Sequence, residues 1–200
     1  MAYASVAEAR EWLTIDDSYD DSTIALALTS AEDAVTEHCG WRFDSVSATY
    51  VFRAHSSSTL DLGALPLASS SITLKTDDNA DGVYETTWAS TDYQLEPLNG
   101  VGPNGLTGWP YTTIRGIDRA FPIDGNGRPG VQIVGTFGWA AVPDNVKLAT
   151  IMTAGWVWTA KATPSGVMVT EFGPVSVRQV PQAERLLRVY RRGTAIVGIA

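Results

Sequence analysis

An acidic turn offers the densest set of metal-type ligands in this chain. The run Asp77-Asp78-Asn79-Ala80-Asp81-Gly82 places oxygen-bearing side chains at the first, third and fifth positions and glycine at the sixth, as a calcium-binding loop does. The twelfth position of such a loop needs a bidentate carboxylate, and here it is Trp88. We therefore interpret the run as an acidic hairpin turn, with a weak surface calcium site as the minor alternative, and we predict no metal-binding residue.

A glycine-rich run, Gly125-Asn126-Gly127-Arg128-Pro129-Gly130, has the spacing of a dinucleotide-binding fingerprint. That fingerprint lies between a strand and a helix, whereas here Pro129 intervenes and a strand pattern follows from Val131. The run is therefore interpreted as a turn, and the sequence predicts no cofactor.

Nucleophiles and imidazoles are scarce. His38 and His55 are the only histidines, Cys39 is the only cysteine, and none has the spacing of a zinc site. His55 lies beside Ser56, Ser57 and Ser58, but no Gly-x-Ser-x-Gly elbow frames them, which favours a polar loop. Cys39 follows a helical pattern and is expected to be a small buried residue. The many carboxylates occupy turns and helix starts, so the sequence predicts no catalytic residue and no enzyme.

Four arginines near the C-terminus form the strongest basic cluster. Arg185, Arg188, Arg191 and Arg192 flank Leu186, Leu187 and Tyr190 in a short helix pattern from Gln182 to Arg192. An uncharged apolar tail, Ala195 to Ala200, follows. Free tails are usually polar, so we expect this one to pack on a partner or to add a strand to a sheet edge.

Charge is unevenly divided along the chain. Residues 1–100 hold 17 acidic and 4 basic residues, which gives −13, and residues 101–200 hold 5 acidic and 10 basic residues, which gives +5, summing to −8. Affinity for nucleic-acid backbones comes from Lys and Arg, so gripping DNA is not the main task of an acidic chain. The basic end could meet an acidic partner, or the two halves could simply be solvated surfaces of different sign.

Two helices are predicted at the start of the chain. Ser5 and Glu8 form a capping-box pattern for a helix that ends near Thr14, and an acidic linker from Asp16 to Asp21 follows. The second helix runs from Ser22 to Cys39, with Gly40 as its C-cap. Its apolar face is built at spacings of three and four residues by Ile24, Leu28, Ala31, Val35 and Cys39.

Short β-branched runs then predict a small antiparallel sheet, with Asp81-Gly82 as a hairpin turn. Asn99 to Trp109 is glycine-rich and is expected to be a long exposed loop. The predicted strands are Ala48 to Arg53, Ser71 to Lys75, Val83 to Trp88, Thr112 to Arg115 and Val131 to Phe137.

A late helix, from Pro143 to Ala162, is apolar on nearly every face. Its uncharged run, Leu148 to Ala160, is 13 residues. That is roughly 20 Å of helix, whereas a bilayer core needs about 30 Å. This helix is therefore expected in a protein core or at the junction of the core with a neighbouring subunit, and not in a membrane.

The predicted fold class is α+β. N-terminal helices (1–45) and the late apolar helix (141–163) form a helical bundle, interrupted in sequence by an inserted β-rich region (46–140). The last segment, 164–200, is predicted to be a C-terminal arm with a strand-like Val175 to Val177, the short basic helix and the apolar tail.

Three segments, in this order, resemble the head-to-tail connector (adaptor) proteins of long-tailed bacteriophages. Val6 to Phe43, with DDSTIALALTSAEDAVTEHCGWRF, resembles the opening pair of helices of that family. Val131 to Lys161 resembles its strand, glycine-aromatic turn, Val-Pro and helix, and LLRVYRR at Leu186 to Arg192 resembles its C-terminal helix. The resemblance covers roughly half of the chain, and the β-rich middle is longer than a minimal connector requires.

The resemblance implies a structural subunit of the virion neck. Such subunits form a ring, expected to be dodecameric, that docks on the portal protein and joins head to tail. The ring continues a channel through which DNA passes without sequence-specific binding. It also contacts a downstream neck or tail-completion protein. The implied location is the head-tail interface of the virion, after assembly in the host cytoplasm.

In that picture the C-terminal arm reaches the portal. Arg185, Arg188, Arg191 and Arg192 would pair with portal carboxylates, and Ile196, Val197 and Ile199 of the tail would add apolar contact. Two alternatives remain open. The first is another neck ring or tail-completion protein with similar helices. The second is a glycan-binding or hydrolytic β module, which the bracketing helices disfavour.

Overall fold

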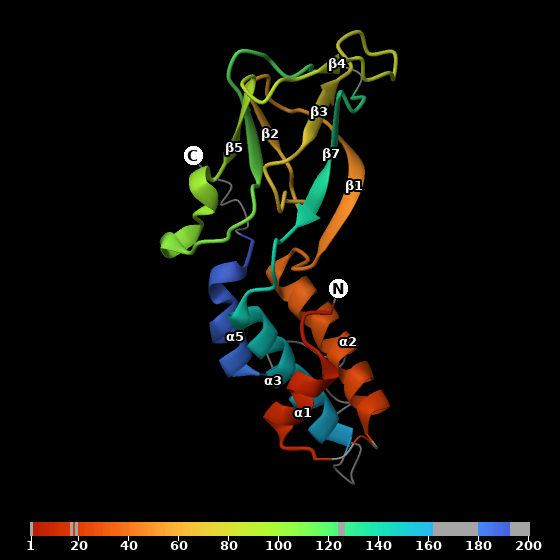
Figure 1. Cartoon of the computed structure of the whole chain (residues 1–200), viewed down its shortest axis with the longest axis vertical. Coiled ribbons are helices and arrows are strands. Elements are labelled where there is room, and N and C mark those ends of the chain that lie inside the picture. Colours follow the sequence, from red (N-terminus) through yellow and green to blue (C-terminus); the bar gives the residue numbers. More distant parts are fainter. Residues whose placement is uncertain (1, 17, 19, 124–126, 162–179, 193–200) are drawn as a thin grey trace, which may run out of the picture. The chain divides into compact units, whose positions relative to one another are not determined.

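The computed structural model describes residues 2–16, 18, 20–123, 127–161 and 180–192 (Figure 1). The fold class is α+β, as predicted. The chain divides into two compact units: a helical unit made of residues 1–43 and 142–200, and a β unit made of residues 44–141. The residues of the predicted strand Val175 to Val177 and of the tail Ala195 to Ala200 lie outside the described residues.

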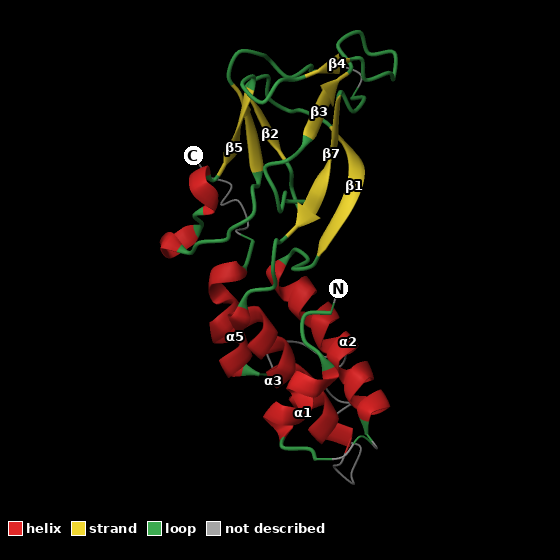
Figure 2. Cartoon of the chain, in the orientation of Figure 1, coloured by secondary structure: helices red, strands yellow, loops and turns green. Residues whose placement is uncertain are grey.

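The helical unit is a bundle of α-helices. Its elements are α1 (Val6–Leu13), α2 (Asp21–Cys39), α3 (Asp144–Lys161), α5 (Pro181–Leu187) and the short 3-10 turn η4 (Arg188–Tyr190). Helix α3 packs against α1, α2 and α5. Figure 2 shows α3 between α2 and α5.

The capping signals predicted for the two N-terminal helices are confirmed. The Ser5 hydroxyl accepts a hydrogen bond from the Glu8 N–H, and the Glu8 carboxylate accepts one from the Ser5 N–H, which confirms the capping box. Thr14 ends α1 in the left-handed conformation. Gly40, at φ +78, ends α2, where glycine avoids the steric cost of that conformation. The predicted buried face of α2 is also confirmed.

Helix α3 is the centre of the bundle. From Val146 to Trp158 no residue is exposed, which confirms that an all-round apolar helix needs neighbours on all sides. Apart from Val146, the fully buried positions are small or polar: Ala149, Thr150, Thr153 and Ala154 are among them. The two threonine hydroxyls donate to carbonyls one turn earlier, so no polar atom of these side chains is left unsatisfied. None of the described helices is long and apolar enough to cross a bilayer.

The short basic helix is confirmed with different limits. It begins at Pro181 and ends at Leu187, and the remainder of the predicted span is the 3-10 turn η4 followed by extended residues. Proline suits the first turn of a helix because its missing N–H has no intrahelical partner there.

The β unit contains two antiparallel sheets, whereas one small sheet was predicted. The first sheet has the order β1-β7-β3-β4 and the second has the order β2-β6-β5. The strands are β1 (Ser45–Phe52), β2 (Thr59–Asp61), β3 (Thr73–Thr76), β4 (Thr86–Thr87), β5 (Tyr93–Glu96), β6 (Thr113–Gly116) and β7 (Val131–Gly138).

Two of these strands, β2 and β5, were not predicted from the sequence. β2 is only three residues long, and in β5 (YQLE) Tyr93 is the one strand-favouring residue, so both carry a weak strand signal. The predicted Val83–Trp88 strand is also too long, since only Thr86–Thr87 pairs with β3.

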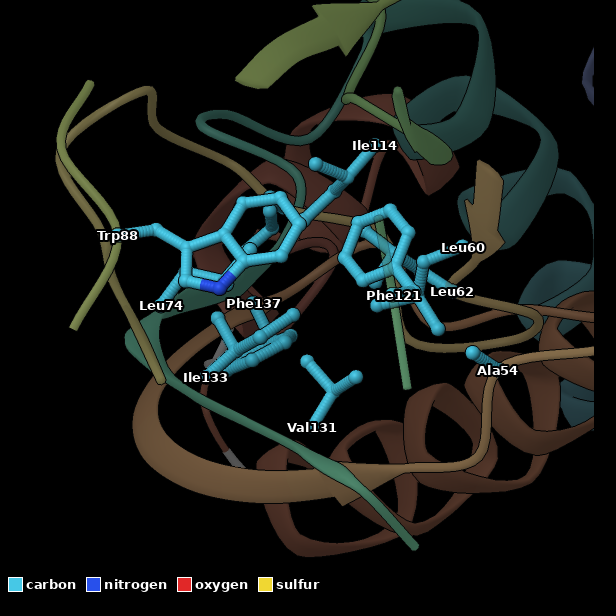
Figure 3. Close-up of a cluster of buried hydrophobic side chains, with 11 residues drawn as sticks. Ala54, Leu60, Leu62, Leu74, Trp88, Ile114, Phe121, Val131, Ile133 and Phe137 are labelled. Carbon is cyan, nitrogen blue, oxygen red and sulfur yellow. The ribbon is translucent and has the colours of Figure 1, made fainter. Parts of the chain in front are cut away.

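The core of the β unit lies between the two sheets (Figure 3). Leu60 and Ile114 come from the β2-β6-β5 sheet, and Leu74, Ile133 and Phe137 come from the β1-β7-β3-β4 sheet. The Trp88 and Phe121 rings stack at 4.7 Å between their centroids. Large apolar side chains from two layers therefore hold this unit together.

The predicted loop from Asn99 to Trp109 is mostly exposed, as expected, but the expectation that it does not pack is wrong. Two 3-10 turns, η1 (Leu98–Gly100) and η2 (Pro103–Gly105), fold the segment back on itself, and Trp109 is buried. A Cβ atom at Gly102 would lie 2.2 Å from Trp109 Cδ2. Glycine at this position therefore permits close packing against the indole instead of marking an unpacked chain.

Candidate interface surfaces

The predicted basic cluster is a surface of the helical unit. In α5 and η4, Ala183, Leu187 and Tyr190 are buried, and their spacing of four and three residues turns one side of the segment toward the bundle. The four arginines are exposed on the remaining surface and are named here the basic face: Arg185, Arg188, Arg191 and Arg192.

Hydrogen bonds hold the end of the basic face to the C-terminus of α2. The Arg192 N–H donates to the Cys39 carbonyl at 2.8 Å, where a helix end leaves carbonyls without intrahelical donors. The Trp41 indole N–H donates to the Tyr190 carbonyl, also at 2.8 Å and buried. Both bonds join residues that are far apart in sequence, so they fix Arg191 and Arg192 against α2.

Aromatic packing reinforces this attachment. Phe43 meets Tyr190 edge-to-face at 6.0 Å and Tyr3 edge-to-face at 5.7 Å between ring centroids. The Phe43 N–H donates to the Tyr3 hydroxyl at 3.0 Å. Burial raises the pKa of Tyr190. The sequence analysis named Tyr190 but not Tyr3 or Phe43, although Trp41 and Phe43, which follow α2, are a usable signal for an aromatic cluster.

The outer face of α2 is a second surface that the sequence analysis did not identify. Its exposed residues recur at three and four positions, opposite the buried face, and begin apolar or neutral and end acidic: Ser22, Leu26, Thr29, Asp33 and Glu37. Leu26 is 71% exposed, the largest exposed fraction among the large apolar side chains of the described residues. The two acidic residues Asp33 and Glu37, four positions apart and outside the apolar face, are a sequence signal that could have identified this surface.

An ion pair joins α1 to α3. The Lys147 ammonium lies 2.7 Å from the Glu8 carboxylate. Hydrogen bonds from Lys147 and then from Ser5 lower the pKa of Glu8 to about 2 from 4.5. The same carboxylate therefore caps α1 and fastens it to the central helix.

The acidic turn of the β unit is organised by its own backbone. Buried Asp77 accepts hydrogen bonds from the Asp81 N–H at 3.2 Å and from the Gly82 N–H at 2.8 Å. Carboxylate oxygens of Asp77, Asp81 and Glu85 lie within 4.8 Å of one another. Because Asp77 uses both oxygens in the turn, hairpin formation explains the cluster, and its strands β3 and β4 pair as a hairpin.

The other candidate chemical residues occupy structural positions. Burial raises the pKa of the Cys39 thiol to about 12, so the thiolate needed for nucleophilic attack is disfavoured. His55 is exposed in a bend, where the Ser56 hydroxyl bonds that of Ser58 at 3.1 Å. The glycine-rich run leads into strand β7 at Val131, as the turn interpretation predicts.

The structure therefore brings together the four arginines, while the predicted apolar contacts Ile196, Val197 and Ile199 lie outside the described residues.

No known protein-family model matches the chain, and no curated protein matches it significantly.

Solved structures with the same fold come from gene transfer agent particles, two of them from the neck. A chain in the neck of the empty particle, computed with C6 symmetry, has a TM-score of 0.59 and 16% identity. One in the neck of the native particle, computed with C12 symmetry, has a TM-score of 0.56 and 19% identity, and one in the native virion has 0.55 and 20%. Each match covers 96% of this chain and 91% of the other.

Proposed function

We propose that this chain is a structural subunit of a virion neck, without a catalytic role. The observation that carries the proposal is the fold shared with neck chains of gene transfer agent particles over 96% of the sequence. Because the match spans nearly the whole chain, the helices and the β-rich insertion belong to one shared architecture. A glycan-binding β module would account for the β unit alone.

We infer that copies of the chain assemble into a ring that continues a DNA channel. The related neck structure computed with C12 symmetry supports a dodecamer. The net charge of −8 supports a channel wall that lets DNA pass, since few Lys and Arg contacts to phosphates are available to hold it. The ring would lie at the head-tail interface of the virion, after assembly in the host cytoplasm.

The basic face and the C-terminal tail are proposed to dock on the portal protein. Arg191 and Arg192 are held on a rigid support by α2, which suits an interface because little side-chain and backbone ordering remains to be done on binding. Ile196, Val197 and Ile199 follow directly and would bury apolar area next to these charges. The opposite side of the ring would contact a downstream neck or tail-completion protein.

Co-assembly with the portal protein of the same particle tests this proposal. The full chain and the portal are mixed, and electron microscopy and native mass spectrometry should show a ring-sized oligomer of this chain seated on the portal. A chain that stays monomeric in the presence of the portal would contradict the ring.

A tail variant then tests the docking surface. Deleting residues 193–200 should weaken co-sedimentation with the portal. As a matched control, a chain of unchanged length with Ile196→Ser, Val197→Ser and Ile199→Ser separates the apolar contact from tail length. Portal binding that survives the deletion unchanged would remove the tail from the interface.

A further inference from the structure

Two exposed faces of opposite charge lie on helices that pack against α3. One is the outer face of α2, which ends in Asp33 and Glu37, and the other is the basic face of α5 and η4. Each points away from α3, because the buried residues of α2 and of α5 lie on the opposite side of their helices. Figure 2 shows α2 and α5 on different sides of α3.

The charges on the two faces have matching spacing. Asp33 and Glu37 are four residues apart, which is about 6 Å along a helix, and Arg185 and Arg188 are three apart, which is about 4.5 Å. Two acidic groups one turn apart can therefore meet two arginines about one turn apart. Guanidinium groups suit such contacts because they donate to carboxylates in a bidentate manner.

These charges have no ion-pair partner within the described part of the chain. Among the described residues of the helical unit, Arg10 pairs with Asp21 and Lys147 pairs with Glu8, and neither pair includes Asp33, Glu37, Arg185 or Arg188. Leu26, which is largely exposed, adds one apolar side chain to the same face of α2. Unpaired charges of opposite sign on the two faces allow electrostatic complementarity between copies of the chain.

We propose that the outer face of α2 in one copy binds the basic face in the adjacent copy, with Asp33 and Glu37 against Arg185 and Arg188. The inference rests on the proposed ring. A closed ring of identical chains needs two different, mutually complementary surfaces on every chain, and these two faces meet that requirement. A second copy is favoured over DNA because the α2 face is acidic.

This contact narrows the portal docking proposed above from the whole basic face to its end, and so divides the four arginines between two partners. Arg185 and Arg188 lie on the helical part of the segment and face the neighbouring copy. Arg191 and Arg192 lie beyond η4, next to the tail, and remain for the portal. The ring contact and the portal contact therefore use adjacent but separate residues.

Charge reversal on each face tests the contact, with the portal present as above. The α2-reversed variant carries Asp33→Lys and Glu37→Lys, and the α5-reversed variant carries Arg185→Glu and Arg188→Glu. Alone, each places like charges together, and the ring-sized species in native mass spectrometry should fall about tenfold or more. Combining all four substitutions in one chain, or mixing the two variants, restores opposite charges and should restore rings.

A matched control reverses two exposed acidic residues outside both faces. Glu11→Lys with Asp16→Lys changes the net charge as much as the α2-reversed variant does and should leave ring formation unchanged. All substituted side chains in both faces are exposed, so thermal unfolding should stay near that of the wild type. Circular dichroism checks this for each variant.

The possible outcomes distinguish failure of the proposed contact from failure of the proposed ring. Rings that persist in both reversed variants would overturn the contact and leave the ring itself standing. Loss of rings without rescue in the fourfold or mixed samples would also overturn it, since charge complementarity would then not be the cause. A wild-type chain that forms no ring on the portal would remove the proposed function, and this contact with it.

Discussion

Helix α3 and strand β7 are the central elements of the two units, but they are packed by different means. The fully buried positions of α3 carry mostly small or polar side chains, such as Ala149 and Ala154, with Val146 as the largest, so neighbouring helices can approach closely. Those of β7 carry large ones, Val131, Ile133 and Phe137, which fill the space between two sheets. The helical unit is therefore expected to be sensitive to added volume, and the β unit to lost volume.

Truncation of Phe137 should give the largest effect. Its ring meets Tyr50 edge-to-face at 4.7 Å and stacks with Phe52 at 6.1 Å between centroids, and its side chain is fully buried. Phe137→Ala removes these contacts and leaves a cavity, so the free energy of unfolding should fall by about 3–5 kcal/mol. Urea unfolding measures it. In the same strand, Val134 is 42% exposed, and Val134→Ala should change stability by about 0.5 kcal/mol or less.

An enlarging substitution tests the other half of the comparison. Ala31 is fully buried on α2, in a cluster that contains Ile151 and Ala154 of α3. Ala31→Leu has no free volume to enter and should lower the free energy of unfolding by about 1–3 kcal/mol. The same change at exposed Ala25, on the same helix, should be near neutral. Equal effects at both positions would contradict close packing as the organising feature of the bundle.

The loop from Asn99 to Trp109 lies in the β unit, but its packing depends on a small residue, Gly102, as packing in the helical unit does. Gly102→Ala would force a methyl group into the Trp109 ring and should destabilise the protein by about 1–3 kcal/mol. The cost should disappear in a Trp109→Ala background, since the clashing ring is then gone. A double-mutant cycle measures this coupling, and additive effects would show that the two residues do not interact.

The helical unit was easier to predict than the β unit. The Ser5–Glu8 capping box, the apolar face of α2 and the all-round burial of α3 all follow from local spacing, which a sequence displays directly. Strands β2 and β5 are short, and they are strands because each pairs with β6. Such pairing is non-local, so their own residues carry no clear sign of it.

The candidate surfaces were predicted only in part. Exposure of the four arginines follows from their spacing around Leu187 and Tyr190. Their attachment through Arg192 to Cys39, and through Trp41 to Tyr190, depends on contacts between distant parts of the chain. Asp33 and Glu37 at the end of α2 were not identified from the sequence, because a role for them is suggested only once the basic face is placed on a different helix of the same bundle.

The smallest predicted effect concerns the ion pair that fastens α1 to the centre of the bundle. The folded protein holds the pKa of Glu8 at about 2, below its ordinary value of 4.5. The stabilisation is therefore present above pH 4.5 and is lost as the pH falls toward 2. Glu8 is 40% exposed, so water screens the pair and its contribution should be about 0.2–1 kcal/mol.

Glu8→Gln isolates this contribution because glutamine can keep the capping-box hydrogen bond while losing the charge. Urea unfolding of both proteins should show the wild type more stable at neutral pH and the two converging between pH 4.5 and 2, a window set by the folded and ordinary pKa values of Glu8. A difference that stayed constant across this window would mean that the pair does not depend on ionised Glu8. Packing against the small buried residues of α3 would then be what holds α1 in position.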